Sequence, residues 1–112
     1  MDLLARLHAD PLWQIINKAS QRHHELPYTY KVNGTLQNRI IDLLYQDAEG
    51  WHIIDFKTDP IASSAEEEAL IMKYSPQIRR YKNAVWDLLH IEADAHICFL
   101  DDQCQLKLVE MG

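Results

Sequence analysis

The segment from Ile40 to Lys57 constrains the fold more than any other part of the chain. It contains two runs of branched apolar residues separated by the polar sequence Asp47-Ala48-Glu49-Gly50. Apolar β-branched runs bounded by turn residues are typical of strands with a buried face. The segment therefore predicts two antiparallel strands joined by a four-residue turn.

Each predicted strand carries one carboxylate among its apolar residues, Asp42 in the first and Asp55 in the second. With a turn over residues 47–50, Gln46 pairs with Trp51, and the same register places Asp42 opposite Asp55. Directly opposed side chains have Cβ atoms roughly 4.5–5.5 Å apart, and like charges at that spacing repel each other. A divalent cation between the two carboxylates would turn this repulsion into binding.

Alternation along the second strand places Lys57 on the same face as Asp55 and turns Phe56 to the opposite face, toward the core. The hairpin therefore presents two carboxylates and one ammonium group together. A shift of one residue in the register would break this grouping, so it depends on the predicted turn.

The composition is that of one small domain with a modest core. Hydrophobic residues make up 47% of the 112 residues and charged residues 25%, and no apolar run approaches the roughly 20 residues of a membrane span. The N-terminus does not resemble a signal peptide. Cys98 and Cys104 are too few for a disulfide scaffold, so we expect reduced thiols in a cytoplasmic protein. The net charge of -6 argues against general affinity for nucleic acid, although a local basic patch could provide it.

Apolar periodicity and turn residues predict the remaining elements. In chain order, these are a helix over 3–20 divided at Asp10-Pro11, a strand over 26–32 with a turn at Asn33-Gly34, strands over 35–45 and 51–58, a short helix after Ser63, a helix over 76–90, and strands over 95–100 and 105–109. This order predicts a mixed central sheet with flanking helices, of α/β or α+β type.

Capping residues predict where the helices start. Asp10-Pro11 and Ser75-Pro76 each combine a capping side chain with a proline, which is favoured at the first helical position. Ser63-Ser64 precedes an acidic run and predicts a separate short helix. In the helix from Pro76, helical spacing directs five residues toward the core: Ile78, Tyr81, Val85, Leu88 and Leu89.

The window from Ala69 to Trp86 is strongly basic. It contains no acidic residue and four basic ones, Lys73, Arg79, Arg80 and Lys82. Gln77 and Tyr81 are four residues apart and therefore share one face of the predicted helix. A helix N-terminus with nearby arginines is suited to bind phosphate. The alternative is a solvated basic face with Tyr81 in the core.

Together, the hairpin and this helix predict a metal-dependent phosphodiesterase site. Asp42, Asp55 and the backbone carbonyl of Phe56 would supply oxygen ligands of the kind Mg²⁺ prefers. The metal would activate water and neutralise charge on the scissile phosphate. Lys57 would position the nucleophile and stabilise the transition state. The alternative is a salt-bridged pair of strands without catalysis.

The same residues closely resemble the motifs of the PD-(D/E)XK nucleases. Asp42, then Asp55-Phe56-Lys57-Thr58-Asp59, then Gln77-x-x-x-Tyr81 occur in the order found in the nuclease domain of RecB and AddA, the helicase–nucleases known as exonuclease V. The segment Glu25-Leu26-Pro27-Tyr28 is similar to the Glu-x-Pro-aromatic segment of that group. The resemblance covers residues 12–109.

The resemblance implies a restriction-endonuclease-like core and exonuclease-type cleavage of DNA in repair and recombination, with Mg²⁺ or Mn²⁺ as cofactor. DNA is the implied substrate and a helicase subunit or domain the implied partner, and exposed apolar surface would also permit dimerisation. Glu25 is either a further acid of the site or a solvated connector residue. The implied catalytic residues are Asp42, Asp55, Lys57, Gln77 and Tyr81.

Two features depart from the family pattern. Arg39 stands three residues before Asp42, where the family has glycine. The family also carries a metal-binding histidine on a helix before the Glu-x-Pro segment, and only His8, His23 and His24 are candidates to replace it. We therefore expect residues 1–112 to form one domain that lacks the histidine-bearing helix. Such a domain is either an active nuclease, or a nuclease-like domain that binds DNA or a partner protein.

Overall fold

The described part of the chain forms two short helices, three strands, one long helix and two further strands of the same sheet. The computed structural model describes residues 3–103 and 105–111. The elements are α1 (Leu3–Ala9), α2 (Pro11–Asn17), β1 (Gln21–Val32), β2 (Thr35–Asp47), β3 (Gly50–Lys57), α3 (Ser64–Leu89), β4 (Ala93–Asp102) and β5 (Gln105–Met111). Within these ranges, five strands form one sheet in the order β1-β2-β3-β4-β5, with β3 and β4 parallel and the other pairs antiparallel. The predicted mixed sheet flanked by helices is confirmed.

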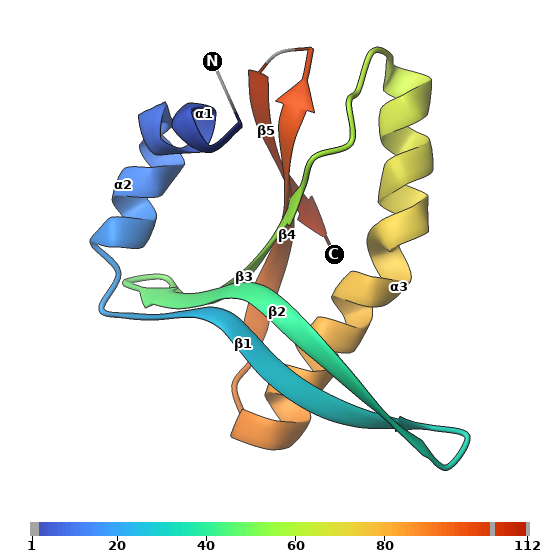
Figure 1. Ribbon diagram of the computed structural model, residues 1–112. Coiled ribbons are helices and arrows are strands. Elements are labelled where there is room, and N and C mark those ends of the chain that lie inside the picture. Colours follow the sequence, from blue (N-terminus) through green and yellow to red (C-terminus); the bar gives the residue numbers. More distant parts are fainter. Residues whose placement is uncertain (1–2, 104, 112) are drawn as a thin grey trace.

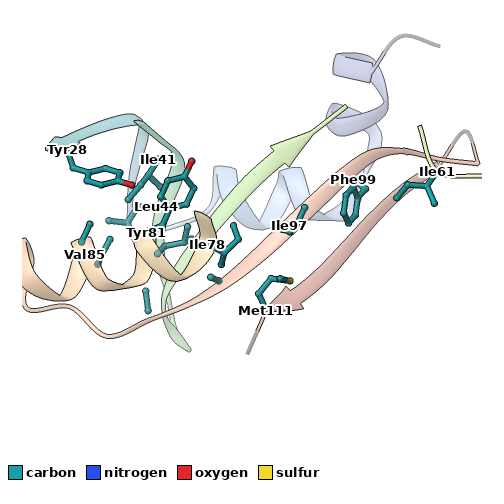
Figure 2. Packing of buried hydrophobic residues seen from close by; sticks show 14 residues of the cluster. Tyr28, Ile41, Leu44, Ile61, Ile78, Tyr81, Val85, Ile97, Phe99 and Met111 are labelled. Atoms are coloured by element: carbon teal, nitrogen blue, oxygen red, sulfur yellow. The ribbon is translucent and has the colours of Figure 1, made fainter. Parts of the chain in front are cut away.

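The helices pack on opposite faces of the sheet (Figure 1). Leu12 and Ile16 of α2 are buried against Leu43 and Cys98 on one face. On the other face, apolar residues of α3 pack against all five strands. Figure 2 shows this second core, in which Tyr81 and Val85 of α3 lie close to the β1–β2 ribbon.

The β2–β3 hairpin has the predicted register. Gln46 lies opposite Trp51 and Leu43 lies opposite Ile54. The regular pairing ends at Leu43 and Ile54, and beyond it the Asp42 carboxylate accepts a hydrogen bond from the Phe56 N–H. Direct opposition of Asp42 and Asp55 therefore stays a prediction. Gly50 ends the turn with a φ of 123°, a conformation that side chains rarely adopt. The side chain of Phe56 packs on the α2 face, as alternation predicts.

The two helices predicted around Pro76 are one helix, so this prediction was wrong. Ser63 caps α3 by accepting a hydrogen bond from the Glu66 N–H. Ser75 does not cap a new helix, because its hydroxyl donates to the carbonyl of Ile71 within the same helix. A proline removes one helical hydrogen bond, but the helix packs on the core on both sides of it, through partly buried Ile71 and Tyr74 before it and buried Ile78 after it. Figure 1 shows α3 bending near its middle.

Several predicted boundaries also differ from the structure. Leu88 and Leu89 are 58% and 49% exposed rather than in the core, and they line a shallow pocket between the end of α3 and the β1–β2 ribbon. β1 begins at Gln21 instead of residue 26, because pairing with β2 satisfies the backbone of this polar segment. Cys98 is a buried free thiol, as expected, whereas Cys104 lies outside the described residues.

Among the described residues, no helix has the length and apolar character needed to cross a membrane.

Candidate functional site

The two hairpin carboxylates lie beside the backbone of Phe56. Asp55 is 2% exposed and Asp42 is half-buried. Asp42 Oδ2 accepts a hydrogen bond of 2.9 Å from the Phe56 N–H. Because the N–H and C=O of one strand residue point to the same neighbouring strand, the Phe56 carbonyl also points toward β2. The three oxygen donors expected from the sequence are therefore directed to the same part of the structure.

A local irregularity in the sheet accompanies this arrangement. Ile41 and Leu44 both pack in the core on the α3 face, while Leu43 packs on the α2 face. Strict alternation would place residues 41 and 43 on one face, so the pattern breaks at Asp42. The β1–β2 register continues past this point, and Glu25 lies at the position opposite Asp42 with a φ of 53°. Left-handed conformations are uncommon for residues other than glycine, and sequence reasoning missed this one.

The environment of Asp55 suits a bound cation. Burial is the main factor that raises its pKa from 3.8 to about 6; Lys57 lowers the pKa, and the neighbouring Asp42 raises it. Asp55 Oδ2 lies 3.0 Å from Lys57 Nζ. Although this ion pair is short, no hydrogen bond from the residues described here reaches the buried Oδ2 atom. A buried carboxylate whose Oδ2 faces one ammonium, beside a second carboxylate and a carbonyl, fits the oxygen coordination of Mg²⁺.

Lys57 is held by residues from α3. Its Nζ donates a hydrogen bond of 2.9 Å to Gln77 Oε1 and lies 4.2 Å from the centroid of the Tyr74 ring. The Tyr74 hydroxyl in turn donates to Asp59 Oδ1 at 2.9 Å. Sequence reasoning gave Tyr74 no role, although it precedes Gln77 by three residues and therefore shares its helix face.

Tyr81 is both a core residue and a neighbour of the carboxylates. It is 3% exposed, and its ring meets that of Tyr28 edge-on at 5.9 Å. Burial, followed by the charges of Asp55 and Asp42, raises the pKa of its hydroxyl well above the usual 10. Tyr81 is thus a neutral phenol packed beneath the carboxylate pair.

The four basic residues of α3 fall into two groups. Lys73 Nζ lies 5.2 Å from the Tyr74 ring, and Arg80 follows Gln77 by three residues, so both flank the site. Arg79 and Lys82 instead line a separate cavity of about 500 Å³ between α3 and the end of β5. The basic window predicted as one phosphate-binding surface therefore has two sides.

No contact among the described residues joins a histidine to Asp42 and Asp55. His8 packs on Trp13 at a ring distance of 4.6 Å, on the α2 face of the sheet. The His23 ring lies 6.3 Å from that of Trp51, and His24 is exposed on β1. The predicted substitutes for the family histidine are therefore not seen at the carboxylates.

A second group that could hold a metal lies elsewhere on β4 and β5. Ligand atoms of Asp94, His96 and Glu110 all lie within 4.8 Å of one another. Asp94 also meets buried His52, whose Nδ1 is 2.6 Å from Asp94 Oδ1 and whose Nε2 is 2.7 Å from Asp47 Oδ1. Asp94 forms ion pairs with His52 and His96, while the buried His96 Nδ1 has no hydrogen-bond partner among the described residues.

Through His52, this second group makes the stability of the fold depend on pH. Burial lowers the His52 pKa, but hydrogen bonds to Asp47 and Asp94 outweigh it, and the pKa rises above 6.5. A histidine whose pKa is raised in the folded state stabilises the fold fully at pH values below its unfolded-state pKa. This contribution is lost as the pH rises through the folded-state pKa. We therefore expect the free energy of unfolding in urea to fall as the pH is raised from about 6.5. Replacing His52 with glutamine should flatten this dependence, and an unchanged slope would contradict the assignment.

Comparison with known proteins relates the chain to bacterial helicase/nucleases. No protein-family model matches it. The sequence is 31% identical over 103 residues to an ATP-dependent helicase/nuclease subunit of Lysinibacillus sphaericus, covering 82% of this chain and 8% of that protein. The protein of the same name from Carboxydothermus hydrogenoformans is 31% identical over 98 residues, covering 76% of this chain and 8% of that protein. The protein of the same name from Lachnoclostridium phytofermentans is 42% identical over 50 residues, covering 45% of this chain and 4% of that protein.

The chain is similar to one short region of these helicase/nucleases. It spans about 8% of the length of the first two relatives.

Proposed function

We propose that this chain is a Mg²⁺- or Mn²⁺-dependent DNA nuclease domain of the PD-(D/E)XK type, with exonuclease-type activity in DNA repair or recombination. The observation that carries the proposal is the buried Asp55 carboxylate. Its Oδ2 has an ion pair with Lys57 but no hydrogen bond within the described structure, and Asp42 lies beside it. A group this costly to bury is typical of a functional site.

The residues divide the chemical work in the proposed reaction. Asp42, Asp55 and the Phe56 carbonyl would hold the metal, which when bound supplies an activated water and offsets phosphate charge. Lys57 stabilises the negative charge that develops on the phosphate. Gln77 and Tyr74 keep the Lys57 ammonium beside Asp55. Glu25, one strand further out, is the candidate for an additional acid.

The relatives are named as helicase/nucleases, and we assign this chain to the nuclease activity from its sequence. The sequence contains three glycines, and none belongs to a phosphate-binding Gly-Lys loop. A motor activity would therefore come from a helicase subunit or domain, which we propose as the partner. We also propose a cytoplasmic location, because the proposed substrate is DNA.

A second candidate function keeps the fold without the chemistry. The observation that favours it is the absence of a described contact between any histidine and the two carboxylates, whereas the resembling nucleases use a histidine there. In that case the chain is a nuclease-like domain that binds DNA or a partner protein.

Calorimetric titration with Mn²⁺, followed by cleavage assays on end-labelled linear and single-stranded DNA, tests the proposal. We expect one bound ion and Mn²⁺-dependent cleavage in the wild type, and loss of both in Asp42→Ala because one of two carboxylate ligands is removed. Asp94→Ala is the matched control, since it removes a carboxylate from the other acidic group and should leave both intact.

The outcomes separate the two candidate functions. Mn²⁺ binding without cleavage, or no Mn²⁺ binding at all, would favour the nuclease-like binding domain. Binding lost in Asp94→Ala and kept in Asp42→Ala would contradict the proposed metal site and assign the ion to the group on β4 and β5.

A further inference from the structure

Positive charge is concentrated in two segments that contain no acidic residue. Residues 26–41 and 69–86 together hold six of the eleven lysines and arginines and none of the seventeen aspartates and glutamates. The protein as a whole carries a net charge of -6. Charge segregation of this kind is what a binding surface for a polyanion requires.

The fold brings the two acid-free segments together along one groove. The first forms the outer part of the β1–β2 ribbon, which projects beyond the rest of the molecule (Figure 1), and the second forms the middle of α3. A groove of about 380 Å³ runs between them. Thr29 and Lys31 line it from β1, and Arg80 and Asn83 line it from α3.

The polar side chains of this groove suit a nucleic-acid backbone. Lys31 and Arg80 are exposed and can each neutralise a phosphate. Thr29 and Asn83 are also exposed, and hydroxyl and amide groups commonly contact phosphate and sugar oxygens. Asp87 lies just past the acid-free part of α3 and is the carboxylate in this lining. It would repel a phosphate, so the part of the groove suited to a nucleic-acid backbone ends there.

The groove begins next to the candidate site. Arg80 follows Gln77 by three residues, so the two side chains are neighbours on α3, and Gln77 contacts Lys57. Asn83 is six residues beyond Gln77, about 9 Å along the helix axis. That length corresponds to about three nucleotides at roughly 3.4 Å per nucleotide along one strand. A strand that places one phosphate at the carboxylates can therefore continue into the groove.

We propose that the groove between the β1–β2 ribbon and α3 binds the sugar–phosphate backbone of DNA about two to three nucleotides from the cleaved bond. This inference rests on the proposed function for the position of the cleaved bond, but binding in the groove needs no catalysis. Lys31 and Arg80 provide the phosphate contacts from opposite walls. In this proposal the β1–β2 ribbon forms one wall of the DNA-binding groove. Arg80 belongs to this groove, whereas Arg79 and Lys82 line the other cavity beside β5.

Fluorescence anisotropy with labelled DNA in EDTA tests the groove without cleavage. We expect Lys31→Ala and Arg80→Ala each to weaken binding several-fold and to reduce the slope of log K against log salt concentration by about one. Lys18→Ala is the matched control, because Lys18 is exposed at the end of α2 on the other face of the sheet, and it should bind like the wild type. Single-stranded and duplex probes of equal length, measured separately, show which form of DNA enters the groove.

The result can separate the groove from the proposed function. Unchanged affinity and salt slope in both variants would overturn the groove, even if Asp42-dependent cleavage is found. Weakened binding in both variants would support the groove, even if the wild type never cleaves DNA. Polyglutamate that competes as well as DNA of equal charge would overturn the assignment to DNA. Circular dichroism of each variant excludes unfolding as the cause of lost binding.

Discussion

Replacing Asp55 with asparagine is expected to abolish metal-dependent cleavage and to stabilise the metal-free protein. Burial raises the pKa of Asp55 from 3.8 to about 6, so the ionised group opposes folding at neutral pH. The shift corresponds to about 2–3 kcal/mol. Asparagine has nearly the same shape without the charge, so urea unfolding at pH 7 should show a gain of about 2 kcal/mol.

The pH dependence gives this prediction a definite sign. A carboxyl whose folded-state pKa is raised stabilises the protein below its unfolded value of 3.8, and this contribution is lost as pH rises through about 6. The wild type should therefore lose stability between pH 4 and 6 through this group, and Asp55→Asn should not. Asp102→Asn, which changes a carboxylate at the end of β4, is the matched control and should retain the wild-type behaviour.

Divalent ions should make the wild type more stable than Asp55→Asn, which reverses the order expected without metal. A ligand that binds only the folded state stabilises it in proportion to RT ln(1 + [L]/Kd). Adding Mn²⁺ is therefore expected to raise the midpoint of unfolding in the wild type and to leave Asp55→Asn unchanged. A destabilised Asp55→Asn protein, or one that still gains stability from Mn²⁺, would contradict a role for Asp55 as a metal ligand.

Replacing Lys57 with methionine is expected to lower the single-turnover cleavage rate by roughly 10²–10³-fold, the range typical for the loss of one group that stabilises transition-state charge. Methionine retains most of the apolar stem but removes the ammonium that lies 3.0 Å from Asp55 and 2.9 Å from Gln77. The fold should persist at a cost in stability, since Lys57 belongs to neither apolar cluster but buried Asp55 loses its ion-pair partner.

Two further measurements distinguish catalysis from a structural role of Lys57. Because Lys57 lowers the pKa of Asp55, its removal should shift the rising limb of the pH–rate profile to higher pH. Lys107→Met removes a lysine that pairs with Glu67 on a different part of the fold and should cleave at the wild-type rate. Equal cleavage by the wild type and Lys57→Met would show that the ammonium takes no part in the reaction.

The central part of the site could be predicted because it follows from local rules. A hairpin register is fixed once its turn is known, and Asp47-Ala48-Glu49-Gly50 is a strong enough turn signal to pair Leu43 with Ile54. Counting then brings Asp42 close to Asp55, although the regular pairing stops one residue before them. Gln77, which the family resemblance placed among the site residues, accepts a hydrogen bond from Lys57.

Features that depend on tertiary packing could not be predicted in this way. Tyr74 contacts Lys57 only because one helix runs through Pro76, and the local rules for Ser75-Pro76 favoured a break there. The change of faces at Asp42 occurs where β1 and β2 are irregular together, opposite the left-handed Glu25. The sequence has no glycine or proline at this point that would indicate it. Which basic side chains of α3 face the carboxylates depends on how the helix is rotated on the sheet, which the basic window itself does not specify.

Pro76 lies between the two residues of α3 that hold Lys57. Tyr74 precedes it and Gln77 follows it, so the two contacts to the ammonium belong to different halves of the bent helix. Because proline cannot donate to the carbonyl of Met72, this is the point at which α3 flexes at the lowest energetic cost. A hinge motion there would change the separation of Tyr74 and Gln77, and with it the distance of the Lys57 ammonium from Asp55.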